Sequence, residues 1–166
     1  MELTSLNELL IHELQDLYDA EHQITQALPK LAQKVEDTKL KSAFEQHLRQ
    51  TEGQIRRLEK CFELMGEAPE RKHCKGVEGL LKEGDELIEE RPPMDVLEAG
   101  LIAGAQKVEH YEMASYGCAR TWARNLRLTE VADLLQTTLD EEGDTDKKLT
   151  EIATKGGVNR EAAQAA

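Results

Sequence analysis

Three glutamates of this chain stand where helical repeats otherwise carry apolar side chains. Glu21, Glu109 and Glu142 each interrupt a seam with alternating steps of three and four residues, the spacing of one helix face. Glu52 lies beside the seam of a fourth segment, one turn from its apolar positions. Carboxylate oxygens suit hard cations, and di-iron or di-manganese sites in four-helix bundles use a glutamate from each helix. The pattern therefore predicts a metal site in a bundle core.

Sequence spacing predicts that these glutamates share one level of the bundle. Glu21 and Glu52 are 31 residues apart around a turn near residue 36, and Glu109 and Glu142 are 33 apart around a turn near residue 126. Antiparallel neighbours place residues at one level when both are equally far from the connecting turn. Each pair is therefore expected to face across its own helical hairpin.

Burial of these carboxylates needs compensation. Each unpaired buried charge costs several kcal/mol, whereas a whole fold is worth about 5 to 15 kcal/mol. A di-iron or di-manganese centre would supply the positive charge. In the metal-free alternative, the glutamates are protonated or paired with Arg49, Arg56 or Arg57.

The composition of the chain and its helix caps and helix breakers predict an all-α fold. The 166 residues suffice for one domain, aromatic residues make up only 4%, and good helix formers dominate. Caps, glycines and prolines predict one helical domain over 1–155 and a loosely ordered tail over 156–166. The expected long helices lie near 4–35, 37–65, 95–124 and 129–154, with a shorter crossover helix near 76–90.

The net charge and the lack of long apolar runs limit the classes of partner and the cellular location that we expect. A formal net charge of -12 disfavours nucleic acid and anionic membrane surfaces, and it favours metal ions. The sequence has no apolar run long enough to cross a bilayer, and its amino terminus lacks the regions of a signal peptide, so we expect a cytoplasmic protein. Cys61, Cys74 and Cys118 lack CxxC spacing and are expected to be free thiols.

Four segments carry a resemblance to a known family. They are ELQDLYDAEHQ (13–23), HLRQTEGQIRRLE (47–59), QKVEHYEMASYG (106–117) and LLQTTLDEEGDTDKKLTEIA (134–153). With them, the chain resembles the YciF-like (YciE/YciF) family of the ferritin-like superfamily over roughly residues 4–155. The resemblance implies a ferritin-like four-helix bundle with a crossover helix, a homodimer, an association with stress, and a di-iron or related dimetal centre.

One departure from the wider superfamily changes the expected ligands. Ferritin-like sites commonly place a histidine three residues after a glutamate on two helices, but Ile55 and Thr145 occupy those positions here. Glu112, in a Glu-x-x-Glu pair with Glu109, and Asp146, one turn after Glu142, are expected to supply oxygen ligands instead.

Four further residues are expected to support the carboxylates. His47 and His110 are candidate donors that hold carboxylates from an adjacent turn, with packed histidines as the alternative. Tyr18 and Tyr116 lie within one turn of candidate ligands and could bond to them, although ordinary core tyrosines are the alternative.

Together with the resemblance, these features predict a ferritin-like, stress-associated protein with a di-iron or di-manganese site, either an oxidoreductase acting on peroxide or oxygen or a metal-handling protein without an assigned reaction. The alternative is a metal-free bundle that serves as an interaction or structural module. A DNA-protecting cage is disfavoured because the chain is acidic and has no basic tail.

Overall fold

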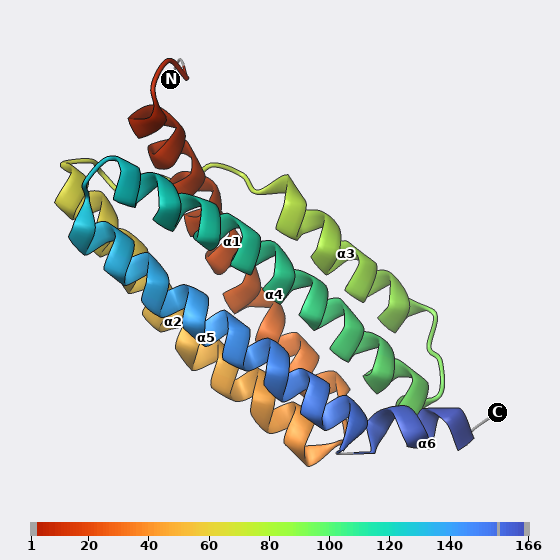
Figure 1. Cartoon of the computed structure of the whole chain (residues 1–166). Helices are drawn as coiled ribbons and strands as arrows, with labels where there is room; N and C mark the ends of the chain where they lie inside the picture. The colour runs from red at the N-terminus through yellow and green to blue at the C-terminus, as the bar shows by residue number, and fades with distance from the viewer. Residues whose placement is uncertain (1–2, 156, 165–166) are drawn as a thin grey trace.

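A computed structural model describes residues 3–155 and 157–164, and Figure 1 shows them as a bundle of helices. Within these ranges there are six α-helices and no strand. The all-α bundle with a crossover helix is therefore confirmed. The helices are α1 (Leu6–Lys34), α2 (Thr38–Met65), α3 (Lys75–Glu89), α4 (Met94–Asn125), α5 (Thr129–Thr154) and α6 (Val158–Gln164).

Two helical hairpins build the bundle. Helix α1 packs against α2, and α4 packs against α5, while contacts of α1 with α4 and of α2 with α5 join the hairpins. The crossover helix α3 runs along the outside, next to α4 and α1 (Figure 1). All four long helices therefore present one face to a shared interior.

The turn between α1 and α2 is fastened to α4. Asp37 caps α2 by accepting hydrogen bonds from the backbone N–H groups of Lys39 (2.9 Å) and Leu40 (2.7 Å). The buried Glu98 side chain at the start of α4 accepts from the N–H groups of Glu36 (2.6 Å) and Asp37 (2.7 Å). This contact fixes the height of the first hairpin relative to α4.

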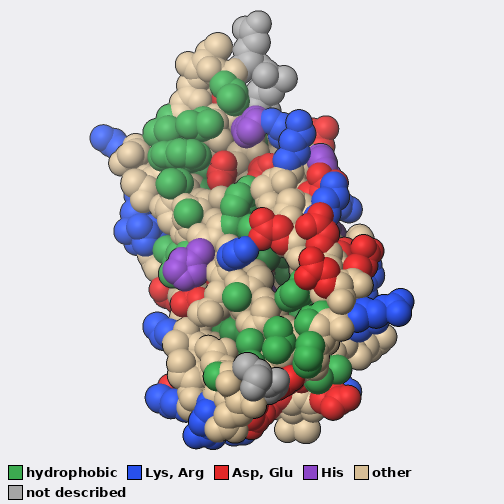
Figure 2. All heavy atoms as spheres, turned by 90° about the vertical axis from the view of Figure 1, so that its right-hand side faces the viewer, with side chains coloured by type: hydrophobic (Ala, Val, Ile, Leu, Met, Phe, Trp, Pro, Cys, Tyr) green, Lys and Arg blue, Asp and Glu red, His purple; other side chains and the backbone are tan. Residues whose placement is uncertain are grey.

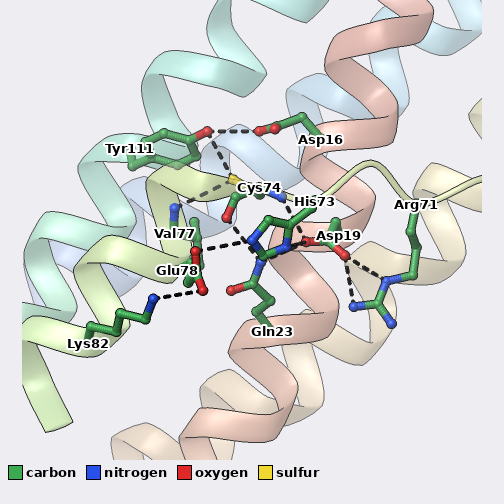
Figure 3. Close-up of polar contacts among 10 residues, drawn as sticks. All are labelled: Asp16, Asp19, Gln23, Arg71, His73, Cys74, Val77, Glu78, Lys82 and Tyr111. Atoms are coloured by element: carbon green, nitrogen blue, oxygen red, sulfur yellow. Dashed lines mark hydrogen bonds and ion pairs between the residues drawn. The ribbon is translucent and has the colours of Figure 1, made fainter.

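The segment that leads into α3 is anchored on α1 through Asp19 (Figure 3). Its buried carboxylate accepts hydrogen bonds from the backbone N–H of Cys74 and from Arg71 Nε, both at 2.9 Å. Tyr111 of α4 donates to Asp16 of α1 at 2.9 Å, and its hydroxyl lies 3.2 Å from Cys74 Sγ. These contacts hold α3 against the outside of the bundle.

The apolar core is divided into two clusters along the bundle. One contains Ile24, Leu28 and Leu149, and the other contains Leu14, Leu17 and Leu135. Since Leu17 and Ile24 are successive apolar steps of α1, the residue between them, Glu21, lies where one cluster gives way to the other. A polar layer therefore separates the two halves of the core.

The carboxyl-terminal segment differs from the loosely ordered tail expected over 156–166. Helix α6 occupies Val158–Gln164 and contacts α4 and α5, and the Val158 side chain is buried in the apolar core. The expectation is wrong for these seven residues because a single apolar anchor holds the helix on the bundle. Positions 156, 165 and 166 lie outside the described residues.

Replacing Glu98 tests the fastening of the α1–α2 turn. We expect Glu98→Ala to lower the free energy of unfolding by about 2 kcal/mol, because two hydrogen bonds to a charged acceptor are lost. Glu98→Gln keeps an acceptor oxygen and should lose less than half as much. Chemical denaturation monitored by circular dichroism measures both variants. An alanine variant as stable as the wild type would contradict this role.

Candidate metal centre

Carboxyl and imidazole groups from all four long helices meet in the polar layer. One ligand atom from each of His47, Glu109, Glu112 and Glu142 lies within 4.8 Å of the others. Glu21 of α1 joins this group, because its charge acts on Glu109 and Glu112. The four glutamate residues are at most 1% exposed. A dense, water-excluded set of acids therefore occupies the centre of the bundle.

Two neutral side chains donate hydrogen bonds to this cluster. The hydroxyl of Tyr116 donates to Glu21 Oε1, and the amide of Gln54 donates to Glu142 Oε1. The buried Tyr116 therefore contacts a candidate ligand, the first of the two alternatives given for it. Both donors fix the direction of a carboxyl group, but neither brings positive charge.

Burial raises the pKa of every glutamate in the cluster. The pKa values of Glu21, Glu109 and Glu112 lie well above their usual range because of burial and repulsion from neighbouring carboxylates. Burial raises the pKa of Glu142 to about 7, although contacts with Glu109 and Gln54 oppose the rise. Burial also lowers the pKa of His47 to about 4, so its imidazole is neutral at pH 7.

Within the described part of the chain, no arginine forms an ion pair with the cluster, although the charge of Arg57 partly opposes the rise in the pKa of Glu21 and Glu142. Arg57 forms a two-point ion pair with Glu141, at 2.8 Å and 2.5 Å, and also donates to Thr138. Arg49 and Arg56, the other candidates for pairing, are exposed. The arginine-paired alternative therefore does not describe these four glutamates, and protons or a cation remain as the sources of neutralisation.

Several buried polar atoms of the cluster have no hydrogen-bond partner. His47 Nε2 lies 3.3 Å from Glu109 Oε1, but the geometry is not that of a hydrogen bond. An unpaired polar atom in the core costs about 1 to 3 kcal/mol, so these atoms together lower the stability of the metal-free fold. The unpartnered atoms are both His47 ring nitrogens, both Glu112 oxygens, and one oxygen each of Glu21, Glu109 and Glu142.

This set of donors fits a transition-metal site. Carboxylate oxygens with one imidazole suit iron and manganese, whereas no thiolate is present to favour softer ions. The cysteines are free, as expected, and none belongs to the cluster. The unpartnered atoms are of the same chemical types as the ligands of known carboxylate-bridged sites.

The prediction that Glu52 turns into the buried layer is wrong. Glu52 is exposed, and the buried face of α2 carries His47, Thr51 and Gln54 instead. These polar residues follow the steps of four and three expected of an inward face. Thr51 belongs to the expected seam of this segment as well, but that seam continues through Leu48 and Ile55, which are only partly buried and lie one position from His47 and Gln54.

Three other expected residues lie away from the cluster. Asp146 is half-buried and accepts a hydrogen bond from Gln106 Nε2 at 2.9 Å, while His110 is largely exposed and lies 3.4 Å from Asp146. Tyr18 donates to Glu59 at 3.0 Å, not to a carboxylate of the cluster. Tyr18 therefore does not support the cluster as expected. His110 does lie beside a carboxylate that was expected to be a ligand, that of Asp146, whose charge in turn acts on Glu109.

His47 has a more central place than its expected supporting role. Among the candidate ligands, His47 is the one that α2 supplies, whereas Glu52 was the residue expected to do so. Gln54 was not foreseen at all. A sequence pattern that indicates both residues is the series of positions 40, 44, 47, 51 and 54. Its steps of four and three place His47, Thr51 and Gln54 on the same helix face as the buried Leu40 and Phe44.

The surface carries mixed charge on the face drawn in Figure 2, where acidic and basic side chains lie interspersed with hydrophobic ones. An extended basic face of the kind that binds nucleic acid is absent from this view. Over residues 3–155 and 157–164, none of the helices is both long enough and apolar enough to span a bilayer.

The fold and the cluster define a helical-bundle protein with a buried carboxylate and histidine layer. The family described as "Domain of unknown function (DUF892)" matches residues 5–163, and the chain belongs to this family. Protein YciF of Escherichia coli (strain K12) is 44% identical over 163 residues, which cover 98% of both chains. The predicted resemblance to YciF-like proteins is therefore confirmed.

Solved structures agree with this assignment. The crystal structure of the E. coli stress protein YciF matches with a TM-score of 0.88 and 45% identity, over 90% of this chain and 95% of that one. The YcfI protein of Rhodopseudomonas palustris matches equally well at 39% identity, with the same coverage. A Xanthomonas campestris protein at 21% identity, with a TM-score of 0.74, shares the fold.

The raised carboxyl pKa values predict that metal-free protein loses stability as the pH rises. A carboxyl with a higher pKa in the folded state stabilises the fold at low pH, and this contribution is lost as the pH climbs through the folded pKa. His47, whose pKa is lowered to about 4, makes the free energy of unfolding rise with pH, but only at pH values below the ordinary histidine pKa of 6.5. The slope above about pH 6.5 therefore reports on the carboxyls: on Glu142 up to about pH 7, and on Glu21, Glu109 and Glu112 beyond it.

In this range, each buried carboxyl that still holds its proton in the folded state, but is ionised in the unfolded state, should lower the free energy of unfolding by up to about 1.4 kcal/mol per pH unit. Urea denaturation in the presence of a chelator measures the slope, and Glu112→Gln should make it shallower. A stability that is constant or rises over this range would show that the buried acids are already neutralised in another way.

Proposed function

We propose that this protein binds up to two iron or manganese ions in the polar layer and uses them in redox chemistry toward peroxide or oxygen. The observation that carries the proposal is the buried group of Glu21, Glu109, Glu112, Glu142 and His47, which has unpartnered atoms and no arginine in contact. A bound cation would satisfy these atoms and remove the repulsion among the acids. The description of the E. coli relative as a stress protein supports the same direction.

Residues of this chain would divide the work at the centre. Glu21, Glu109, Glu112 and Glu142 would supply oxygen ligands, and His47 would supply nitrogen. When bound, iron or manganese supplies reversible one-electron chemistry. Tyr116 and Gln54 orient two of the carboxyls through their hydrogen bonds, and the apolar clusters on either side keep water out.

Protons would be displaced when metal enters. Contact between Glu109 and Glu142 favours the proton on Glu109, and contact between Glu21 and Glu112 favours the proton on Glu112. Since carboxylates bind metal in their ionised form, uptake should release protons and should strengthen as the pH rises.

The proposal places the protein in the cytoplasm as a homodimer, in keeping with the family resemblance. Light scattering should then give about twice the 18.7 kDa mass of one chain. A particle of 12 or 24 chains would instead indicate a ferritin-like shell and would contradict this part of the proposal.

Metal titration with matched variants tests the proposal. Iron(II) or manganese(II) should raise the melting temperature of the wild type, because an ion held only by the folded state adds to stability, and chelation should reverse the rise. We expect the double variant Glu112→Gln with Glu142→Gln to lose this response. Without metal, it should be more stable than the wild type by about 1 to 3 kcal/mol, since fewer acids repel one another.

Glu52→Gln is the matched control, because it removes one carboxylate from the exposed side of α2. Its metal response should equal that of the wild type. Absence of uptake by the wild type at millimolar metal, with no thermal shift, would exclude the metal centre and leave the metal-free structural module as the function.

A further inference from the structure

A cavity of about 140 Å³ lies next to the polar layer. All four long helices and α3 contribute to its wall, which places the cavity inside the bundle rather than on one face. Leu28, Phe44 and Val108 are among the buried side chains that make this wall mainly apolar. The cavity therefore offers an apolar ligand a place to leave water.

The inner end of this cavity is formed by two residues of the carboxyl and imidazole cluster. His47 and Glu109 both line it, and they are 4% and 1% exposed. The His47 ring nitrogens and Glu109 Oε2 have no hydrogen-bond partner. One end of the cavity thus presents buried polar atoms that a ligand could satisfy.

The outer end lies between α2 and α5. Gln46 and Asp144, which also line the cavity, are exposed, and Lys148 donates to Gln46 Oε1 at 2.6 Å. Lys148 is therefore already engaged at the opening, while Asp144 would repel an anion. The exposed carboxylate of Asp144 at the opening and the mainly apolar wall, which cannot replace the hydration of a charge, both disfavour a negatively charged ligand.

We infer that this cavity binds a small, uncharged and mainly apolar molecule that carries one hydroxyl group, with the hydroxyl turned toward His47 and Glu109. The size agrees, since a buried apolar cavity of about 150 Å³ holds one benzene molecule. In the metal-free protein, the hydroxyl would satisfy polar atoms of His47 and Glu109 that an entirely apolar ligand would leave unpaired. A role for such a molecule as substrate rests on the proposed metal centre, but its binding does not.

Phenol is a suitable probe because it combines a benzene-sized ring with one hydroxyl. Titration of the full chain as purified, followed by nuclear magnetic resonance of backbone amides, should give a Kd on the order of 1 mM or tighter. The shifted amides should belong to the lining segments of α1, α2, α4 and α5. Toluene, which carries a methyl group in place of the hydroxyl, should bind at least about threefold more weakly than phenol.

Two variants fill the cavity without changing a polar residue of the layer. Ala43→Leu and Ala105→Leu both add side-chain volume at its wall and should weaken phenol binding at least about tenfold. Ala103→Leu adds the same volume on the exposed side of α4 and should bind like the wild type. Circular dichroism verifies the fold of each variant, and either filled variant alone suffices for the test.

Unchanged phenol binding in a folded filled variant would overturn the assignment, as would the absence of any binding at 10-fold the expected Kd of about 1 mM. Benzoate that binds as tightly as phenol would overturn the uncharged class of ligand, and toluene that binds more tightly would overturn the role of the hydroxyl. Phenol binding by a protein that takes up no metal would keep the cavity assignment and reject only the proposed metal function.

Discussion

Four carboxyl groups buried in a single layer impose the main physical constraint on this bundle. Repulsion between ionised groups a few ångströms apart grows as the surroundings lose water, and desolvation adds a cost for each charge. Protons relieve part of this cost, as the raised pKa values of Glu21, Glu109 and Glu112 indicate. Protons shared between Glu109 and Glu142 and between Glu112 and Glu21 pair some of the carboxyl oxygens, but they leave the imidazole nitrogens of His47 without partners.

The surrounding structure keeps these groups together against their repulsion. Apolar clusters close the layer from both sides, and Glu98 fastens the first hairpin to the helix that carries Glu109 and Glu112. The guanidinium group of Arg57 is paired with Glu141 and therefore forms no ion pair with the buried acids. A stable scaffold that maintains a destabilising cluster is typical of functional sites.

Helices were the most predictable part of the molecule, because caps, breakers and apolar steps all act over a few residues. The crossover helix, expected near 76–90, spans Lys75–Glu89. Glu21, Glu109 and Glu142 were also predictable as buried residues, since each stands in a clear apolar seam. Glu112 follows from the same helix face as Glu109.

The face of α2 was harder to predict because two series of residues, one position apart, compete for the inward direction. The apolar series through Leu48 and Ile55 favoured Glu52 as the buried acid, whereas tertiary packing selects His47 and Gln54. The engagement of Arg57 by Glu141 joins residues 84 positions apart, so no local pattern reports it. Helix α6 depends on the burial of Val158, another contact that becomes visible only in three dimensions.

The central claim is that a metal ion neutralises the buried layer, and anomalous X-ray diffraction from crystals grown with manganese(II) or iron(II) tests it most directly. The account predicts anomalous density among Glu21, His47, Glu109, Glu112 and Glu142, at distances typical of metal coordination. Crystals of the metal-treated protein with no anomalous density in this layer, or with density only at surface carboxylates such as Glu52, would contradict it.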